Sequence, residues 1–236
     1  YIDEIICCSG FMKRKMDTNP VFSDKTTALH NFVESVSKED VIKKKYVLYF
    51  GRYSVEKGIG SLIKACKELP EVKFIFAGSG PLESELSDIE NITNVGFQTG
   101  ENLKKLIKEA RFSIYPSEWY ENCPFSVMES QMYGTPVLGA DIGGIPELIL
   151  DGISGKLFES GNIDDLKEKI LLQMNEDVIA KYTKQIKDLE KQTKELYMNL
   201  EPLKLEIKGK FGVDVANIFT EKVQELAENF NLLQVV

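Results

Sequence analysis

The sequence predicts an α/β fold: a doubly wound parallel sheet followed by a helical tail. From residue 46 to about residue 175, short apolar runs alternate with amphipathic stretches. The run at 72–77 is almost continuously apolar, as is typical of a strand buried on both faces of a parallel sheet. Chains that alternate in this way form a sheet with helices on both faces, and ligands bind beyond the carboxyl ends of its strands.

The same patterns place the individual elements. The apolar runs predict strands at 46–50, 72–77, 92–95, 112–115, 136–139 and 155–158. The amphipathic stretches predict helices near 58–68, 82–88, 101–110, 125–133, 145–150 and 162–174. Loops leaving the carboxyl ends of the strands should converge on one edge of the sheet, and we expect the ligand site there.

Both ends of the chain lie outside this alternation. Residues 2–8 predict a strand that needs a sheet to join, and the chain starts at Tyr1 without a methionine, so we expect a fragment of a longer protein. Beyond residue 175, apolar residues recur every three or four positions in two stretches. They predict two helices, which either pack on the α/β domain or form a seam for oligomerisation.

Charge and composition argue against several classes of function. The 236-residue chain has a net charge of -8 and no concentrated basic stripe, which disfavours nucleic acid as a partner. His30 is the one histidine, which disfavours a histidine-based triad or a multi-histidine metal site. The four cysteines have no zinc spacing and suit a reducing cytoplasm. No apolar run reaches the roughly 18 residues of a membrane span.

Two glutamates, Glu121 and Glu129, bracket the most informative stretch of the sequence. The residue before a proline avoids the α region, so a helix should begin after Pro124, at about Phe125. Its free backbone amides would then point between the two carboxylates, making a site for an anion flanked by acceptors for hydroxyl groups. A nucleoside diphosphate sugar has these parts. The alternative is a chance spacing of two surface glutamates.

A second candidate follows the predicted strand at 46–50. Gly51 and Arg52 come directly after it, and Lys57 and Gly58 follow closely. Arginine can bind phosphate in bidentate fashion and lysine adds a point charge, so this loop predicts a phosphate clamp. The alternative is that both cations are ordinary surface charges.

A series of motifs in this sequence resembles one known family. It consists of GRYSVEKG, FIFAGSGP, VGF, YPSEWYENCPFSVMESQMYGTPVLG and GGIPELILDGISGKLF. From about residue 1 to about residue 175 the chain resembles the retaining nucleotide-sugar glycosyltransferases of the GT-B fold, group 1 type. The resemblance implies that residues 46–175 are the Rossmann-like, donor-binding C-terminal domain. Residues 1–45 would cross over from a missing N-terminal domain, and residues 176–236 would be an added helical tail.

The resemblance also implies roles for single residues. Arg52 and Lys57 would bind the pyrophosphate and stabilise the charge on the leaving phosphate, where one such donor is worth about 10²–10³-fold in rate. Glu121 would face the donor sugar, and Glu129 would accept hydrogen bonds from the ribose. The donor-binding positions would be Gly51, Gly78, Ser79, Gly80, Phe97, Asn122, Cys123, Pro124, Phe125, Ser126, Val127 and Glu129.

Several of these positions have a second interpretation. Phe97 either presents backbone to the base or is a core residue of a turn, and Cys123 is more simply a small filler than a nucleophile. The glycines of the GGIPE motif, Gly143 and Gly144, serve either turn geometry or ligand contact. The basic cluster at 13–15 is either a solvated surface or a phosphate or membrane contact.

Together these inferences predict a retaining hexosyltransferase that transfers a sugar from a UDP- or GDP-sugar to a saccharide or lipid-linked acceptor, as in polysaccharide biosynthesis. No Asp-x-Asp pair occurs, so we expect transfer without a metal or another cofactor. In this family the acceptor site lies mainly on the first domain, so this fragment should turn over little by itself. We expect a cytoplasmic protein, with peripheral membrane binding of the full-length protein as an alternative.

Two other classes of function stay open. The chain could be a non-catalytic nucleotide-binding or assembly module that uses its helical tail. It could also belong to a related GT-B enzyme, such as a nucleotide-sugar epimerase.

Overall fold

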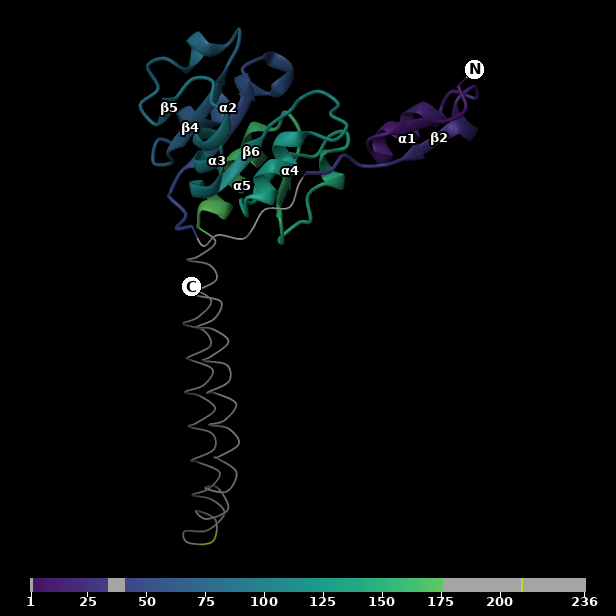
Figure 1. Cartoon of the computed structure of the whole chain (residues 1–236). Helices are drawn as coiled ribbons and strands as arrows, with labels where there is room; N and C mark the ends of the chain where they lie inside the picture. The colour runs from purple at the N-terminus through teal and green to yellow at the C-terminus, as the bar shows by residue number, and fades with distance from the viewer. Residues whose placement is uncertain (1, 34–40, 176–208, 210–236) are drawn as a thin grey trace. The chain divides into compact units, whose positions relative to one another are not determined.

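The computed structural model describes residues 2–33, 41–175 and 209, and it confirms the predicted doubly wound parallel sheet (Figure 1). Six parallel strands lie in the order β5-β4-β3-β6-β7-β8. They are β3 (Val47–Arg52), β4 (Phe74–Ser79), β5 (Ile92–Asn94), β6 (Phe112–Tyr115), β7 (Val137–Ala140) and β8 (Gly155–Phe158). The chain winds outward from β3 to β5 and then returns to the other side of β3, so a topological switch point lies between β3 and β6.

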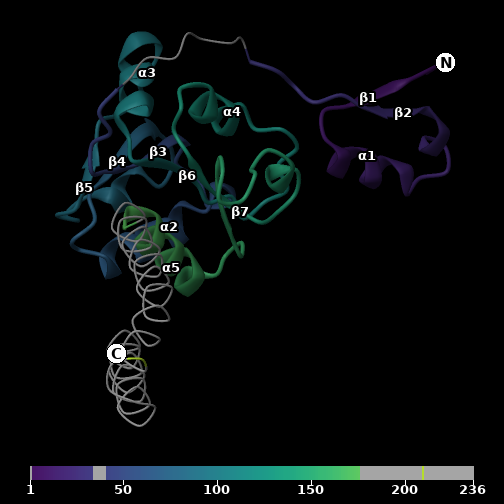
Figure 2. The ribbon, with the colours of Figure 1, turned by 90° about the horizontal axis from the view of Figure 1, so that it is seen from below.

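Helices cover both faces of this sheet. Within residues 41–175 they are α2 (Ile59–Glu68), α3 (Gly100–Glu109), α4 (Phe125–Met132) and α5 (Ile163–Met174). Figure 2 shows α3 and α4 on one face and α2 and α5 on the other. This is the two-sided covering expected of a sheet whose strands are all parallel.

Two of the predicted helices, at 82–88 and 145–150, are wrong. Short 3₁₀ turns stand there instead, η3 (Glu83–Leu86) and η4 (Ile145–Glu147). Asp88 has a φ of 62°, and a left-handed residue cannot continue a right-handed helix. A third turn, η2 (Val55–Lys57), precedes α2. The remaining elements of the sheet domain begin and end within two residues of their predicted limits.

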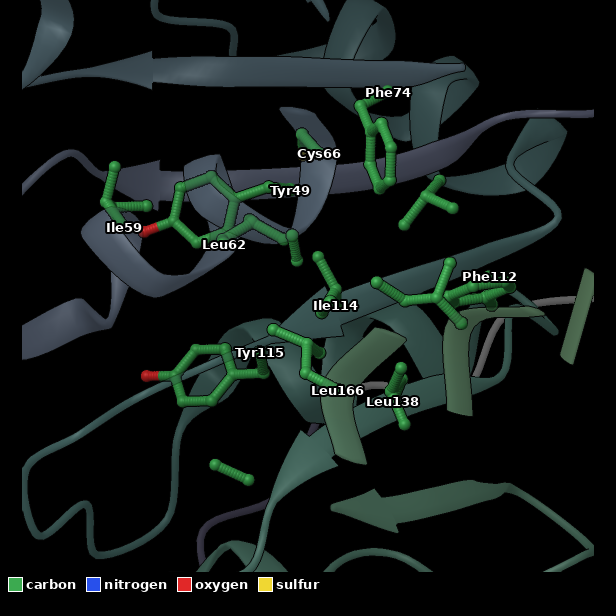
Figure 3. Packing of buried hydrophobic residues seen from close by; sticks show 14 of the residues in the cluster. Tyr49, Ile59, Leu62, Cys66, Phe74, Phe112, Ile114, Tyr115, Leu138 and Leu166 are labelled. Atoms are coloured by element: carbon green, nitrogen blue, oxygen red, sulfur yellow. The ribbon is translucent and has the colours of Figure 1, made fainter. Parts of the chain in front are cut away.

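The core is divided by the sheet into two apolar clusters. On β3, Val47 and Tyr49 belong to the cluster under α2 and α5, whereas Leu48 and Phe50 belong to the cluster under α3. This alternation follows from the period of two along a strand. Figure 3 shows the first cluster, in which the rings of Tyr49 and Tyr115 lie at one end with their hydroxyl oxygens pointing away from Phe74 and Phe112.

A smaller unit precedes the sheet domain. It comprises β1 (Ile5–Cys7), α1 (Gly10–Asp17), η1 (Ser23–Lys25) and β2 (Thr26–Ala28), and β1 pairs with β2 in parallel. The sequence indicated the first strand but missed α1 and β2, which are too short for a clear periodicity. Ser9 is the signal that could have indicated α1, because its hydroxyl accepts from the amide of Met12 as an N-cap.

The predicted helical tail lies outside the described residues, apart from residue 209. The predicted limits of the domains therefore stay predictions. In the described part of the chain, no helix has both the length and the apolar character needed to cross a membrane.

Candidate active site

Two loops meet at the switch point between β3 and β6. The loop after β3 carries Lys57 at the end of η2, and the loop after β6 carries Glu121. The Lys57 ammonium forms an ion pair with Glu121 Oε1, and Ser117 Oγ lies 3.3 Å from the same oxygen. The fold thus joins the predicted phosphate clamp to the predicted sugar-facing carboxylate.

The surroundings of Lys57 keep it charged. Partial burial lowers the pKa of the ammonium, but the hydrogen bond to Glu121 and the charge of that carboxylate outweigh this effect, so the pKa is raised above its ordinary value. Lys57 Nζ also lies 3.4 Å from Tyr115 Oη. An ammonium has three donors, so one of them is left for a ligand oxygen.

Tyr115 was not among the predicted site residues. It is the last residue of β6, its ring is buried in the cluster of Figure 3, and its hydroxyl reaches the site. Burial, and then the neighbouring Glu121 carboxylate, raise the pKa of Tyr115. It therefore stays protonated. A polar-tipped aromatic residue at the carboxyl end of an apolar strand is the signal that could have indicated it.

Arg52 is the last residue of β3, and its side chain is exposed. Its carbonyl accepts a hydrogen bond of 2.7 Å from Tyr49 Oη, which holds the end of the strand. The pKa of Glu56 lies below its ordinary value, first because Ser54 and then the Glu56 backbone amide donate to its carboxylate, and to a smaller extent because of the charges of Arg52 and Lys57. Both predicted cations therefore lie near Glu56, at the same edge of the sheet.

Helix α4 begins at Phe125, as predicted, and Pro124 is its N-cap. In the described part of the chain, the amides of Phe125, Ser126 and Val127 donate to no acceptor. A helix start carries partial positive charge and free donors. It can therefore bind an anion.

Glu129 lies half-buried on α4, and burial raises the pKa of its carboxyl. Next to it, Ser130 Oγ lies 2.8 Å from Ser113 Oγ of β6 in a buried pair that holds α4 on the sheet. No described residue donates to the Glu129 carboxylate. A half-buried acceptor without a donor suits the hydroxyl groups of a ligand.

The predicted nucleoside loop, Gly78 to Gly80, lies against the end of β3. A Cβ on Gly78 would lie 1.9 Å from Gly51 O, and one on Gly80 would lie 2.4 Å from Tyr53 O. Close packing of the two strand ends accounts for these glycines. Ser79 is exposed at the same edge.

The remaining site positions separate into exposed and buried ones. The Phe97 side chain is 73% exposed, which excludes the interpretation as a core residue, and no described contact joins it to the Lys57–Glu121 pair. Asn122 is also exposed. Cys123 is buried, and burial raises the pKa of its thiol, which fits a small filler.

The two glycines of the GGIPE motif pack on the loop that carries Glu121. The amide of Gly144 donates to Glu121 O at 2.6 Å, and a Cβ on Gly144 would lie 1.8 Å from Asn122 O. Gly143 has a φ of +64°. Turn geometry and close approach therefore explain both glycines.

The basic cluster at 13–15 has partners within the chain. Lys13 pairs with Asp17, Arg14 pairs with Glu147, and Lys15 lies over the rings of Phe11 and Tyr120. Within the described ranges, no group of three or more His, Cys, Asp or Glu side chains could hold a metal ion.

A cavity of about 860 Å³ lies at the opposite edge of the sheet, at the amino ends of β3, β4 and β5. Its lining mixes Lys45 and Lys73 with Glu71 and Glu90. Ligands of doubly wound sheets bind at the carboxyl ends of the strands instead. The candidate site is therefore the edge that holds Lys57 and Glu121.

Comparison with known families identifies the family of this chain. A family model described as glycosyl transferases group 1 matches residues 34–196. The chain belongs to this family. The match starts and ends later than the resemblance read from the sequence, which runs from about residue 1 to about residue 175. It includes both Lys57 and Glu121 of this group 1 glycosyl transferase family member.

Curated relatives are named glycosyltransferases. An uncharacterized glycosyltransferase of Methanocaldococcus jannaschii is 27% identical over 188 residues, which cover 76% of this chain and 52% of the relative. A second one from that organism is 30% identical over 198 residues, covering 74% and 49%. The amylovoran biosynthesis glycosyltransferase AmsK of Erwinia amylovora is 32% identical over 146 residues, covering 55% and 36%. The chain spans about half the length of the two Methanocaldococcus relatives, and less of AmsK.

Solved structures confirm the fold. A mutant of S. aureus TarM, in complex with fondaparinux, alpha-GlcNAc-glycerol and UDP, superimposes with a TM-score of 0.67 at 23% identity, covering 75% of this chain and 38% of that chain. Anabaena HepE in complex with UDP gives a TM-score of 0.64 at 21% identity, covering 75% and 55%. The Rossmann-like domain is that of GT-B glycosyltransferases.

Proposed function

We propose that this chain is the donor-binding, C-terminal half of a retaining glycosyltransferase that takes a hexose from a nucleoside diphosphate sugar. The observation that carries the proposal is the Lys57–Glu121 ion pair at the switch point. A cation there would meet the pyrophosphate, together with the free amides of α4, and the carboxylate would accept from the hydroxyls of the sugar. TarM and HepE are both seen with UDP, which supports a uridine nucleotide.

The proposed reaction is a front-face displacement. The bond between sugar C1 and the β-phosphate oxygen breaks while the acceptor oxygen bonds to C1 on the same face, and the acceptor proton passes to the leaving phosphate. Negative charge grows on that phosphate, where Arg52 and Lys57 would stabilise it. Glu121, held by Lys57 and Ser117, is already oriented when the donor binds.

The acceptor would bind to a preceding domain. A sheet of two parallel strands, such as β1 with β2, is ordinarily part of a larger buried sheet. We therefore expect further strands beside it in a full-length protein, and a saccharide or lipid-linked acceptor on that domain. The name of AmsK supports polysaccharide biosynthesis as the setting, and we propose a cytoplasmic site of action. The isolated chain would bind nucleotide and turn over little.

Calorimetric titration of the full chain with UDP, GDP and ADP tests this function. We expect saturable binding of one nucleotide, which would be lost in an Arg52→Ala/Lys57→Ala double variant. Ligand at about 100 times its Kd should also stabilise the fold by about 2.7 kcal/mol. Binding that survives in the double variant would place the nucleotide elsewhere. Product analysis with a labelled UDP-sugar would distinguish transfer from epimerisation.

Replacing Glu129 with glutamine is expected to weaken nucleotide binding about 10-fold while making the free chain slightly more stable. Burial raises the pKa of this carboxyl in the folded state, so the folded chain favours the protonated form. The stabilisation from this protonation is present at low pH and is lost as the pH rises through the folded-state pKa. At pH 7 the variant should therefore unfold about 1–2 °C higher than the native chain. Below about pH 4 the difference should vanish.

The exposed Glu85 of η3 offers the matched control for this variant. Glu85→Gln makes the same chemical change away from the site and should alter neither binding nor thermal unfolding. Equal nucleotide affinity in Glu129→Gln and the native chain would remove Glu129 from the proposed ribose contact.

A further inference from the structure

We propose that Glu147 is a positioning residue: it links the placement of α1 to the loop that carries Glu121. The link itself is structural, and its consequence for catalysis rests on the proposed function. Glu147 ends η4, in the loop that follows β7, and it makes contacts in both directions.

The Glu147 side chain holds the start of α1. Its two carboxylate oxygens accept from the amides of Gly10 and Phe11 at 2.7 and 2.6 Å. Arg14 Nη2 lies 3.2 Å from one oxygen, and His30 Nε2 lies 3.1 Å from the other. A carboxylate at a helix N-terminus interacts with both the free amides and the helix dipole. One side chain therefore provides the anion for the amino end of α1.

The ionisation of Glu147 agrees with this geometry. Partial burial raises the pKa of the carboxyl, but the hydrogen bonds from Gly10, His30, Phe11 and Arg14 together bring it below its ordinary value. The Glu147 carboxyl is therefore ionised at neutral pH, and in this charged form its contacts with α1 are strongest.

The backbone just before Glu147 holds the other side of the link. Gly144 donates to Glu121 O at 2.6 Å, and its Cα packs so closely on Asn122 that a Cβ would lie 1.8 Å from Asn122 O. The same Cβ would lie 3.0 Å from Ser9 Cβ, so the N-cap residue of α1 and the Glu121 loop both approach this one glycine closely.

The segment between these contacts is short and stiff. Only Ile145 and Pro146 separate Gly144 from Glu147; the Ile145 side chain is fully buried and the proline ring restricts φ. A displacement of the Glu147 carboxylate therefore reaches the Gly144 amide, and through it the backbone of Glu121. Since Glu121 pairs with Lys57, the docking of α1 would influence the orientation of both candidate catalytic groups.

Amide-resolved hydrogen exchange on the full chain tests the link without any nucleotide. In Glu147→Gln, the Gly10 and Phe11 amides should exchange faster because the charged acceptor is lost. The deciding amide is Gly144, whose partner is Glu121 O. We expect its exchange to accelerate at least about 10-fold. Glu147→Asp, one methylene shorter, should give the same pattern with a smaller change.

Asp17→Asn is the matched control. Asp17 pairs with Lys13 and accepts from Thr26 at the other end of α1, so this variant also replaces one carboxylate contact of the helix by an amide. It should accelerate exchange in α1 and β2 but leave the Gly144 amide unchanged. The proposal would be overturned if, in both Glu147 variants, the Gly10 and Phe11 amides exchanged faster while the exchange rate of the Gly144 amide did not change. Glu147 would then be only a local cap of α1.

The titration described above supplies a second readout. Glu147→Gln should weaken binding of whichever of UDP, GDP and ADP binds the native chain by about 3- to 10-fold, and Asp17→Asn should not. Failure of the native chain to bind any of them would count against the proposed function, whereas the exchange result at Gly144 alone decides the link.

Discussion

Replacing Lys57 with methionine is expected to lower the affinity for a nucleoside diphosphate by about 10- to 100-fold. A hydrogen bond to a charged partner contributes about 1.5–3 kcal/mol, and each 1.4 kcal/mol is tenfold in binding. The effect should exceed that of an exposed cation because Lys57 is partly buried and is held in place by Glu121 and Tyr115. Calorimetric titration with the nucleotide that binds the native chain measures it.

The exposed Lys64 on α2 provides the matched control. Lys64→Met removes the same charge from the same domain, so it isolates long-range electrostatics from direct contact. We expect less than a twofold change in Kd for Lys64→Met. Equal losses in the two variants would mean that net charge, and not the position of Lys57, controls binding.

A second large effect is expected at Gly58, where alanine should lower the free energy of unfolding by about 2–4 kcal/mol. Gly58 has a φ of +69°, which is strained for any residue with a Cβ. A Cβ there would also lie 1.7 Å from Pro116 O, a backbone atom that cannot rotate away. Chemical denaturation of the full chain, followed by circular dichroism, measures the loss.

Gly60, two residues further along α2, makes an unusually close control. A Cβ on Gly60 would meet nothing within 4 Å, and its backbone is helical. Gly60→Ala should therefore raise the free energy of unfolding by about 0.5–1 kcal/mol. We therefore expect the free energy of unfolding to fall in Gly58→Ala and to rise in Gly60→Ala. A loss of stability in both variants would contradict the geometric argument.

The close packing at Gly58 also affects the geometry expected of the site. It follows Lys57 directly, and Pro116 begins the loop that leads through Ser117 to Glu121. The tight contact between Gly58 and Pro116 therefore sets the distance between the two loops. A variant of Gly58 that still folds should also bind nucleotide less tightly.

The local elements were predictable because their signals are local. Periodicity located the six strands of the main sheet, and Pro124 located the start of α4 at Phe125. The same reasoning failed at 82–88 and 145–150, where one left-handed residue and a proline turn interrupt an otherwise helical pattern. It also missed α1, whose eight residues are too few for a period to stand out.

The sequence by itself determined the fold class, the edge of the sheet where we propose the site, and the residue types there, because period, proline position and motif order can be read along the chain without knowing which segments touch. Only the tertiary structure decided which of these residues meet. Lys57 and Glu121 become partners because β3 and β6 are adjacent at the switch point, although β4 and β5 lie between them in sequence. Tyr115 and Glu147 acquire their roles in the same way, since a contact between distant segments depends on strand order and packing, which no local pattern encodes.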